Sequence, residues 1–160
     1  MNLKDIELVM LDGSNKTFGE IQGKVTMVVN VASRCGLSPQ YETLEAMQKK
    51  YKDKGFTVIG VPSNQFFQEL SSSEDISDYC STTWGVTFPM TEKAKVNGKN
   101  AHPLYKELTK AEDAEGAAGK VKWNFEKFLV LANGEVMRFR PTTKPDAAPI
   151  IEAIEANLAK

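Results

Sequence analysis

The sequence has 160 residues, of which 41% are hydrophobic, so the chain can bury a core without disulfide staples. Its 20 basic and 21 acidic residues nearly cancel and are interspersed, which argues against nucleic acid or an anionic membrane surface as a partner. The first residues lack the basic and apolar regions of a signal peptide, and no apolar run approaches the length of a membrane span. We therefore expect one cytoplasmic domain over residues 1–160. In the cytoplasm, cysteines stay reduced unless they take part in redox reactions.

Strand and helix patterns alternate along the sequence. Asp12-Gly13 and Asn133-Gly134 are hairpin turn signals, and Gly55 is placed to end a helix. Pro39 lies just inside a helix start that Ser38 would cap. In chain order, the predicted elements are strands at 6–10, 16–18 and 25–32, a helix at about 38–53, a strand at 56–61, a serine-capped helix from 71–75 to about 82, a helix from 103, strands at 128–131 and 135–139, and a helix at 146–158.

One cysteine, Cys35, lies where the predicted buried strand gives way to a helix, in the segment Ser33-Arg34-Cys35-Gly36. A thiol there is near the positive end of a helix dipole and beside Arg34, and both favour the thiolate, which is the form that attacks. The alternative is a buried cysteine that acts as a small hydrophobic residue. Polar, glycine-flanked surroundings favour the reactive interpretation.

The order of elements describes a three-layer α/β sandwich, because a parallel strand, crossover helix and parallel strand are followed by an antiparallel hairpin and a terminal helix. This resembles the thioredoxin-like fold, with a central mixed sheet flanked by helices and, here, an N-terminal β-hairpin. Thioredoxin-like proteins usually carry two cysteines separated by two residues, whereas this sequence has Cys35-Gly36-Leu37-Ser38. The missing second cysteine disfavours a dithiol exchanger and favours single-thiol chemistry.

Six sequence blocks occur in order along nearly the whole chain: NVASRCG at 30–36, PSNQF at 62–66, GVTFPM at 85–90, VNG at 96–98, AHPLY at 101–105 and WNFEKFL at 123–129. Together they resemble the glutathione peroxidase family, in its cysteine-containing, thioredoxin-dependent type. The resemblance implies an antioxidant oxidoreductase that reduces hydrogen peroxide and organic or lipid hydroperoxides. It implies no metal and no bound cofactor, with thioredoxin or glutathione as the reducing co-substrate.

The resemblance also implies the residues of the site. Cys35 would attack the peroxide, and Gln68, Trp123 and Asn124 would supply amide and indole N–H donors that stabilise the ionised sulfur. Taken without the resemblance, Trp123 could equally be a core aromatic residue and Asn124 a turn or capping residue.

The sequence departs from the family pattern in the loop that carries Gln68. Only Phe67 separates Gln68 from the 62–66 block, where the family usually has two residues, and the usual Pro-Gly does not follow. Gln65 is therefore the alternative to Gln68. Otherwise Asn64 and Gln65 are expected to shape the loop.

Cys80 is the only other cysteine in the sequence. Many members of the family have a further cysteine at the position of Ser63, so here Cys80 is the only internal partner for Cys35. Cys80 falls where thioredoxin-dependent members carry a resolving cysteine. In that role Cys80 would condense with a Cys35 sulfenic acid, and a thioredoxin-like protein would reduce the disulfide. If the two sulfurs start too far apart for a disulfide, the helix around Cys80 must partly unwind. The alternative from periodicity is a helix-core cysteine packed beside Ile76.

Other functions remain open from the sequence. A one-cysteine, glutathione-dependent peroxidase would use Cys35 alone, and a peroxide sensor would relay its oxidation to a partner protein. Retention of Cys35, Trp123 and Asn124 weighs against a non-catalytic binding module. His102, the only imidazole, has no thiol or carboxylate partner in a motif, so we expect His102-Pro103 to be a structural helix start and not a catalytic base.

Overall fold

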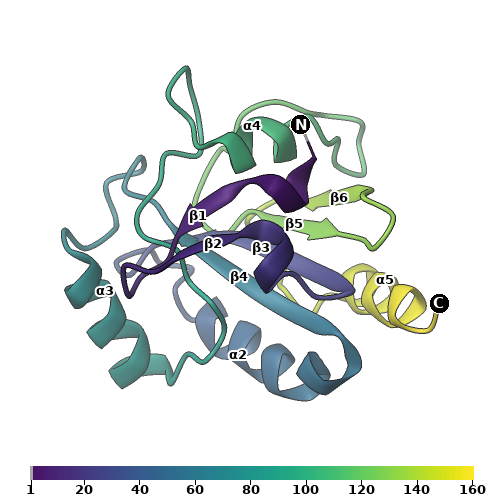
Figure 1. The fold of residues 1–160 in the computed structure, drawn as a ribbon, viewed down its shortest axis with the longest axis horizontal. Coiled ribbons are helices and arrows are strands. Elements are labelled where there is room, and N and C mark those ends of the chain that lie inside the picture. The colour runs from purple at the N-terminus through teal and green to yellow at the C-terminus, as the bar shows by residue number, and fades with distance from the viewer. Residues whose placement is uncertain (1) are drawn as a thin grey trace.

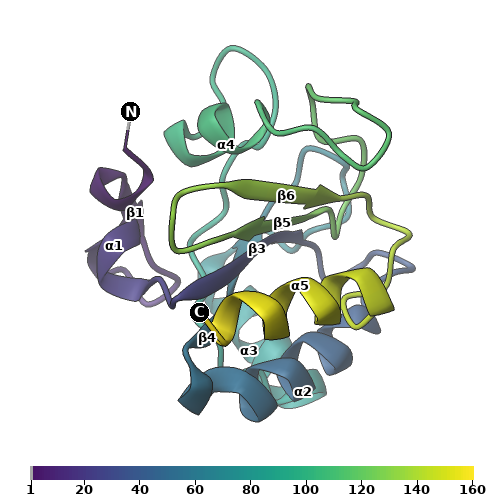
Figure 2. The ribbon, with the colours of Figure 1, turned by 90° about the vertical axis from the view of Figure 1, so that its right-hand side faces the viewer.

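The chain is built around one four-stranded mixed sheet that is covered on both faces (Figures 1 and 2). The computed structural model describes residues 2–160. Its elements are β1 (Glu7–Val9), β2 (Asn15–Thr17), α1 (Phe18–Ile21), β3 (Val25–Val31), α2 (Gln40–Tyr51), β4 (Phe56–Pro62), α3 (Ser73–Tyr79), a π-helix (Cys80–Trp84), α4 (Pro103–Leu108), β5 (Lys127–Val130), β6 (Val136–Phe139) and α5 (Ala148–Leu158), with 3₁₀ turns at Leu3–Asp5 and Lys52–Lys54.

The strand order in the sheet is β4-β3-β5-β6. Strand β3 pairs with β4 in parallel, which requires the α2 crossover, and with β5 in antiparallel. In this register Val31 lies opposite Pro62, and Val29 lies opposite Lys127. The carboxyl ends of β3 and β4 and the start of β5 therefore meet at one edge of the sheet. The predicted thioredoxin-like class, with its N-terminal hairpin β1–β2, is confirmed.

Both faces of the sheet carry an apolar core, which explains why every residue of β3 is buried. On one face Met27 and Val29 pack in a cluster with residues of α2 and α5, and Figure 2 shows these two helices side by side below the sheet. On the other face Val28 packs in a cluster with residues of the hairpin, α1 and α4. The loops that carry polar side chains lie at the edge of the sheet where the strand ends meet.

Three local features differ from the sequence-based expectation. Phe18 was expected to end a strand, but it begins α1, because the Thr17 hydroxyl caps this helix and the Phe18 ring is buried. Helix α2 begins at Gln40 and has no side-chain cap, so the assignment of Ser38 as cap is wrong. Instead, the Ser38 N–H donates to the Cys35 carbonyl in a preceding turn. The third difference is that the helix after Ser72 ends as the π-helix.

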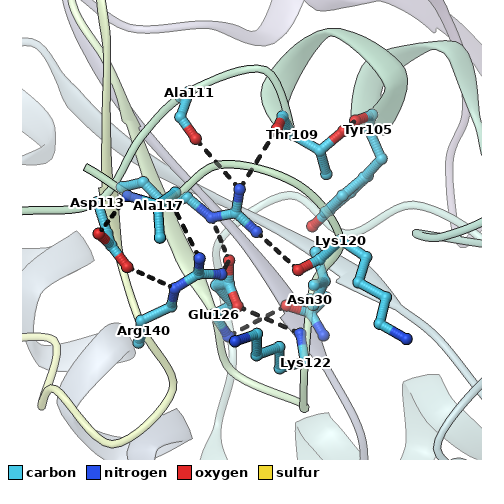
Figure 3. A network of polar contacts seen from close by, with 12 residues as sticks. Asn30, Tyr105, Thr109, Ala111, Asp113, Ala117, Lys120, Lys122, Glu126 and Arg140 are labelled. Atoms are coloured by element: carbon cyan, nitrogen blue, oxygen red, sulfur yellow. Dashed lines mark hydrogen bonds and ion pairs between the residues drawn. The ribbon is translucent and has the colours of Figure 1, made fainter. Parts of the chain in front are cut away.

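A buried ionic network fastens the segment before β5 to the rest of the sheet (Figure 3). The Glu126 carboxylate accepts hydrogen bonds from Arg138 Nε and, at 2.9 Å, from Arg140 Nη1. The Arg138 guanidinium also donates to the backbone carbonyls of Thr109, Ala111 and Lys120. The Glu126 and Arg138 side chains are fully buried, so each charge depends on the other for compensation.

We predict that Glu126→Ala lowers the free energy of unfolding by about 3–5 kcal/mol, because it leaves the Arg138 guanidinium buried without its carboxylate. Lys110→Ala, which removes an exposed ion pair with Glu107, should cost less than about 1 kcal/mol. Urea unfolding of both variants measures the difference. Equal effects would show that the buried network contributes no more than a surface pair.

Candidate active site at the edge of the sheet

The Cys35 thiol lies in the loop between β3 and α2, at the edge where the strand ends meet. It is 4% exposed, and the Leu37 backbone N–H donates to its sulfur at 3.3 Å. A thiolate accepts such a hydrogen bond better than a thiol does. The turn before α2 thus supplies a donor at the sulfur, although the helix itself begins five residues later than Cys35.

The loop after β4 is fastened to the Cys35 loop by its backbone and by a buried carboxylate. The Arg34 N–H donates to the Gln68 carbonyl at 2.8 Å. Glu69 Oε1 accepts from the Ser33 N–H at 3.0 Å and from the Ser33 hydroxyl at 2.5 Å. Burial raises the pKa of Glu69, while the hydrogen bonds from Ser33 oppose that shift. The two loops therefore form one unit around the thiol.

The segment before β5 brings the third part of the site. The Asn124 side chain is fully buried, and its Nδ2 donates to Gln68 Oε1 at 3.0 Å. Its position is fixed because the Phe125 N–H donates to the Asn30 carbonyl and Asn30 Nδ2 donates to the Trp123 carbonyl. Gln68 and Asn124, separated by 56 positions, are thus joined directly.

Trp123 is placed differently from its neighbour. Its side chain is 39% exposed, and its ring lies against Phe66 with 5.3 Å between the ring centroids. It is therefore not a core residue. The described contacts join it to the loop after β4, and they do not join its indole to Gln68 or Asn124 directly.

The shortened loop before Gln68 makes a sharp turn at Phe67. This residue has a φ of 61° and is 88% exposed. A left-handed backbone is uncommon for a residue with a large side chain. The loop is closed by Asn64, whose side-chain oxygen accepts from the Glu69 N–H and whose carbonyl accepts from the Phe67 N–H. Asn64 shapes the loop, as predicted.

Gln65 and His102 have structural contacts. Gln65 Oε1 accepts from the backbone N–H groups of Val96 and Asn97, and its Nε2 donates to the Asn97 carbonyl, so both ends of the amide are engaged away from Gln68. His102 Nδ1 accepts from the Leu104 N–H and caps α4, which is the structural role predicted. Burial lowers the pKa of His102 and favours the neutral ring that this cap requires.

Cys80 is the first residue of the π-helix and is 2% exposed. Burial raises its pKa to about 11, with the nearby Glu69 carboxylate acting in the same direction and the Tyr41 hydroxyl opposing it. Both cysteines are free thiols. The sequence gives no sign that Tyr41 and Glu69 act on the Cys80 thiol, because residue spacing does not show which buried polar groups lie near one another.

Within residues 2–160 there is neither a cluster of metal ligands nor a helix that could span a membrane. No three histidine, cysteine or acidic side chains in this part of the chain converge as metal ligands would. None of its helices combines the length and the apolar character needed to cross a membrane.

Comparison with known proteins matches residues 3–109 to the glutathione peroxidase family. Thioredoxin/glutathione peroxidase BtuE of Escherichia coli (strain K12) is 44% identical over 94% of this chain and 93% of its own length. Glutathione peroxidase-like peroxiredoxin HYR1 of Saccharomyces cerevisiae (strain ATCC 204508 / S288c) is 49% identical over 86% of this chain and 85% of its own. The crystal structure of Trgpx in apo form has a TM-score of 0.77 at 36% identity, covering 100% of this chain and 97% of that one.

We predict that Gln68→Ala slows the oxidation of Cys35 by peroxide roughly tenfold or more, because one preorganised amide is lost and Asn124 loses its partner. Stopped-flow measurement of the single oxidation step tests this. Gln65→Ala is the matched control, since it removes an amide bound to the 96–97 segment, and it should keep a rate near that of the wild type. A slow Gln65→Ala beside a normal Gln68→Ala would reverse the assignment.

Proposed function

The chain belongs to the glutathione peroxidase family and is a thiol peroxidase, and we propose that Cys35 is the group that attacks the peroxide. The observation that carries the proposal is the set of contacts around one thiol. The Leu37 N–H donates to the Cys35 sulfur, and the amide pair of Gln68 and Asn124 is fastened to the same loop through the Arg34 N–H. Donors held in place at a site of developing charge are what this reaction needs.

In the proposed step the Cys35 thiolate attacks one peroxide oxygen and the O–O bond breaks. The sulfur becomes a sulfenic acid, and the departing oxygen takes up a proton and leaves as water or an alcohol. Because Asn124 holds Gln68 Oε1, the Gln68 Nε2 is left to donate to the sulfur or the departing oxygen. We propose hydrogen peroxide and organic or lipid hydroperoxides as substrates, with the exposed Trp123 and Phe67 rings beside the apolar part of the larger ones.

We further propose that Cys80 resolves the sulfenic acid and that a thioredoxin-like protein reduces the disulfide. The Cys80 thiolate would attack the Cys35 sulfur, the S–O bond would break, and the departing hydroxide would take up a proton to leave as water. A dithiol protein would then exchange with the disulfide. The name of the Escherichia coli relative includes thioredoxin, which supports this reductant. Because Cys35 and Cys80 are only 4% and 2% exposed, the α3 and π-helix segment must open for the reductant to reach them. Free cysteines are suited to a reducing compartment, and we place the reaction in the cytoplasm.

A second candidate function is a one-cysteine peroxidase that is reduced by glutathione. The observation that favours it is the burial of Cys80, whose raised pKa of about 11 keeps the thiol protonated and unreactive near neutral pH. A peroxide sensor would use the same thiols but pass the oxidation to a partner protein. Turnover with peroxide, thioredoxin and its reductase alone distinguishes the enzyme from the sensor.

Cys35→Ser is expected to abolish peroxide consumption and to leave the fold intact, because a hydroxyl does not ionise near neutral pH and is close to a thiol in shape. Stopped-flow peroxide reduction measures the loss, and circular dichroism checks the fold. Appreciable turnover by the folded variant would exclude Cys35 as the nucleophile.

Cys80→Ser is expected to keep one rapid oxidation of Cys35 and to lose turnover coupled to thioredoxin, because no internal thiol remains to form the disulfide. In the wild type, thioredoxin should support faster turnover than glutathione under the same peroxide supply. A coupled assay with each reductant gives both results. A Cys80→Ser variant that cycles normally would favour the glutathione-dependent alternative.

A further inference from the structure

Residues 71–87 form the segment that carries Cys80, and few of its side chains reach into the core. The segment comprises α3, the π-helix and the short turns beside them, and Figure 1 shows α3 at the periphery of the molecule. Only Ile76 and Cys80 in this segment are buried. Two of its aromatic rings also pack on α2. A segment with so few buried apolar contacts is one that opens locally at low cost.

Two hydrogen bonds fasten this segment to the body of the protein, and both end on one carboxylate. The Thr87 N–H donates to Glu45 Oε1 at 2.7 Å, and the Thr87 hydroxyl donates to Glu45 Oε2 at 2.6 Å. Glu45 lies in α2 and is 4% exposed. Within residues 2–160, every other well-formed hydrogen bond of residues 71–87 stays inside the segment. The Glu45–Thr87 pair is therefore its polar attachment to α2.

The chain is held firmly on either side of the segment. Before it, Glu69 Oε1 accepts hydrogen bonds from the N–H and the hydroxyl of Ser33. After it, Phe88 is buried, and the Pro89 carbonyl accepts from the N–H of Gly60 in β4 at 2.9 Å. Opening of the segment therefore leaves the sheet and the loops around Cys35 in place.

The proposed disulfide requires this segment to move. A disulfide joins two sulfurs at about 2.05 Å, whereas Cys35 and Cys80 are separate thiols, 4% and 2% exposed. The Cys35 loop is fastened to its neighbour, because the Arg34 N–H donates to the Gln68 carbonyl at 2.8 Å. Cys80, in the loosely attached segment, is therefore the partner that moves.

We propose that the Glu45–Thr87 pair is a latch that holds the Cys80 segment closed and sets how often it opens for the resolving step. This rests on the proposed role of Cys80 as the resolving thiol. Opening breaks both hydrogen bonds to the carboxylate, and bonds to a charged acceptor are stronger than neutral ones. A weaker latch speeds disulfide formation both where opening is a fast equilibrium before the attack and where opening is itself the slow step. Glu45 is in this sense a positioning residue.

The test uses Thr87→Val, which keeps the side-chain shape and the backbone N–H but removes the hydroxyl that bonds to Glu45. Hydrogen exchange followed by mass spectrometry should show roughly tenfold faster exchange in residues 71–87 and unchanged exchange elsewhere. After one equivalent of peroxide, rapid quenching and alkylation, the Cys35–Cys80 disulfide should form roughly tenfold faster, while the first oxidation of Cys35 keeps its rate. Thr87→Ser, which restores a hydroxyl, should return both rates to near the wild-type values.

Thr57→Val is the matched control. The Thr57 hydroxyl bonds to Gln48 of the same helix, but Thr57 belongs to β4 and lies outside the Cys80 segment. This variant should leave segment exchange and disulfide formation unchanged. A Thr87→Val protein whose segment exchanges at the wild-type rate would overturn the latch, and so would faster exchange without faster disulfide formation. If wild-type protein forms no Cys35–Cys80 disulfide, the resolving role of Cys80 fails, and the latch loses its part in that step even where the exchange result holds.

Discussion

The pairing of β3 with both of its neighbours is the constraint on which the rest of the molecule depends. Its parallel register with β4 and antiparallel register with β5 bring three loops to one edge of the sheet. Cys35, Gln68 and Asn124 lie in those loops, and none of them is close to another in sequence. A slip of register by one residue would reverse which side chains face each core, so the same burial that stabilises the sheet also sets the geometry of the site.

Burial shapes the chemistry as well as the fold. The Glu126–Arg138 pair is fully desolvated, and its contacts hold the segment that carries Asn124 in one place. The two cysteines are nearly inaccessible, so under the proposed mechanism α3 and the π-helix would have to open before a protein reductant could reach them. A π-helix begins at Cys80, and π segments are rare in proteins but frequent at functional sites.

Much of the fold follows from local patterns. The β-branched run of β3, the Asn133-Gly134 turn and the left-handed Gly55 end of the α2 region were all predictable, because each rests on a preference of the residue itself. The start of α2 and the π-helix were not, since both depend on loop packing. Nor could spacing show that Trp123 is exposed. The burial of the Tyr41 hydroxyl and of Glu69 Oε2 could not be predicted either, because the surroundings of buried polar atoms are set by tertiary contacts.

The proposed mechanism requires that Cys35 and Cys80 act as one redox pair across the core. Wild-type protein treated with one equivalent of peroxide, then alkylated under denaturing conditions and digested, tests it directly by mass spectrometry. We expect a peptide pair joined through Cys35 and Cys80, a loss of two hydrogens, and no alkylation of either sulfur. An alkylated Cys80 beside a Cys35 that stays as a free sulfenic acid, or carries only an added thiol, would contradict it.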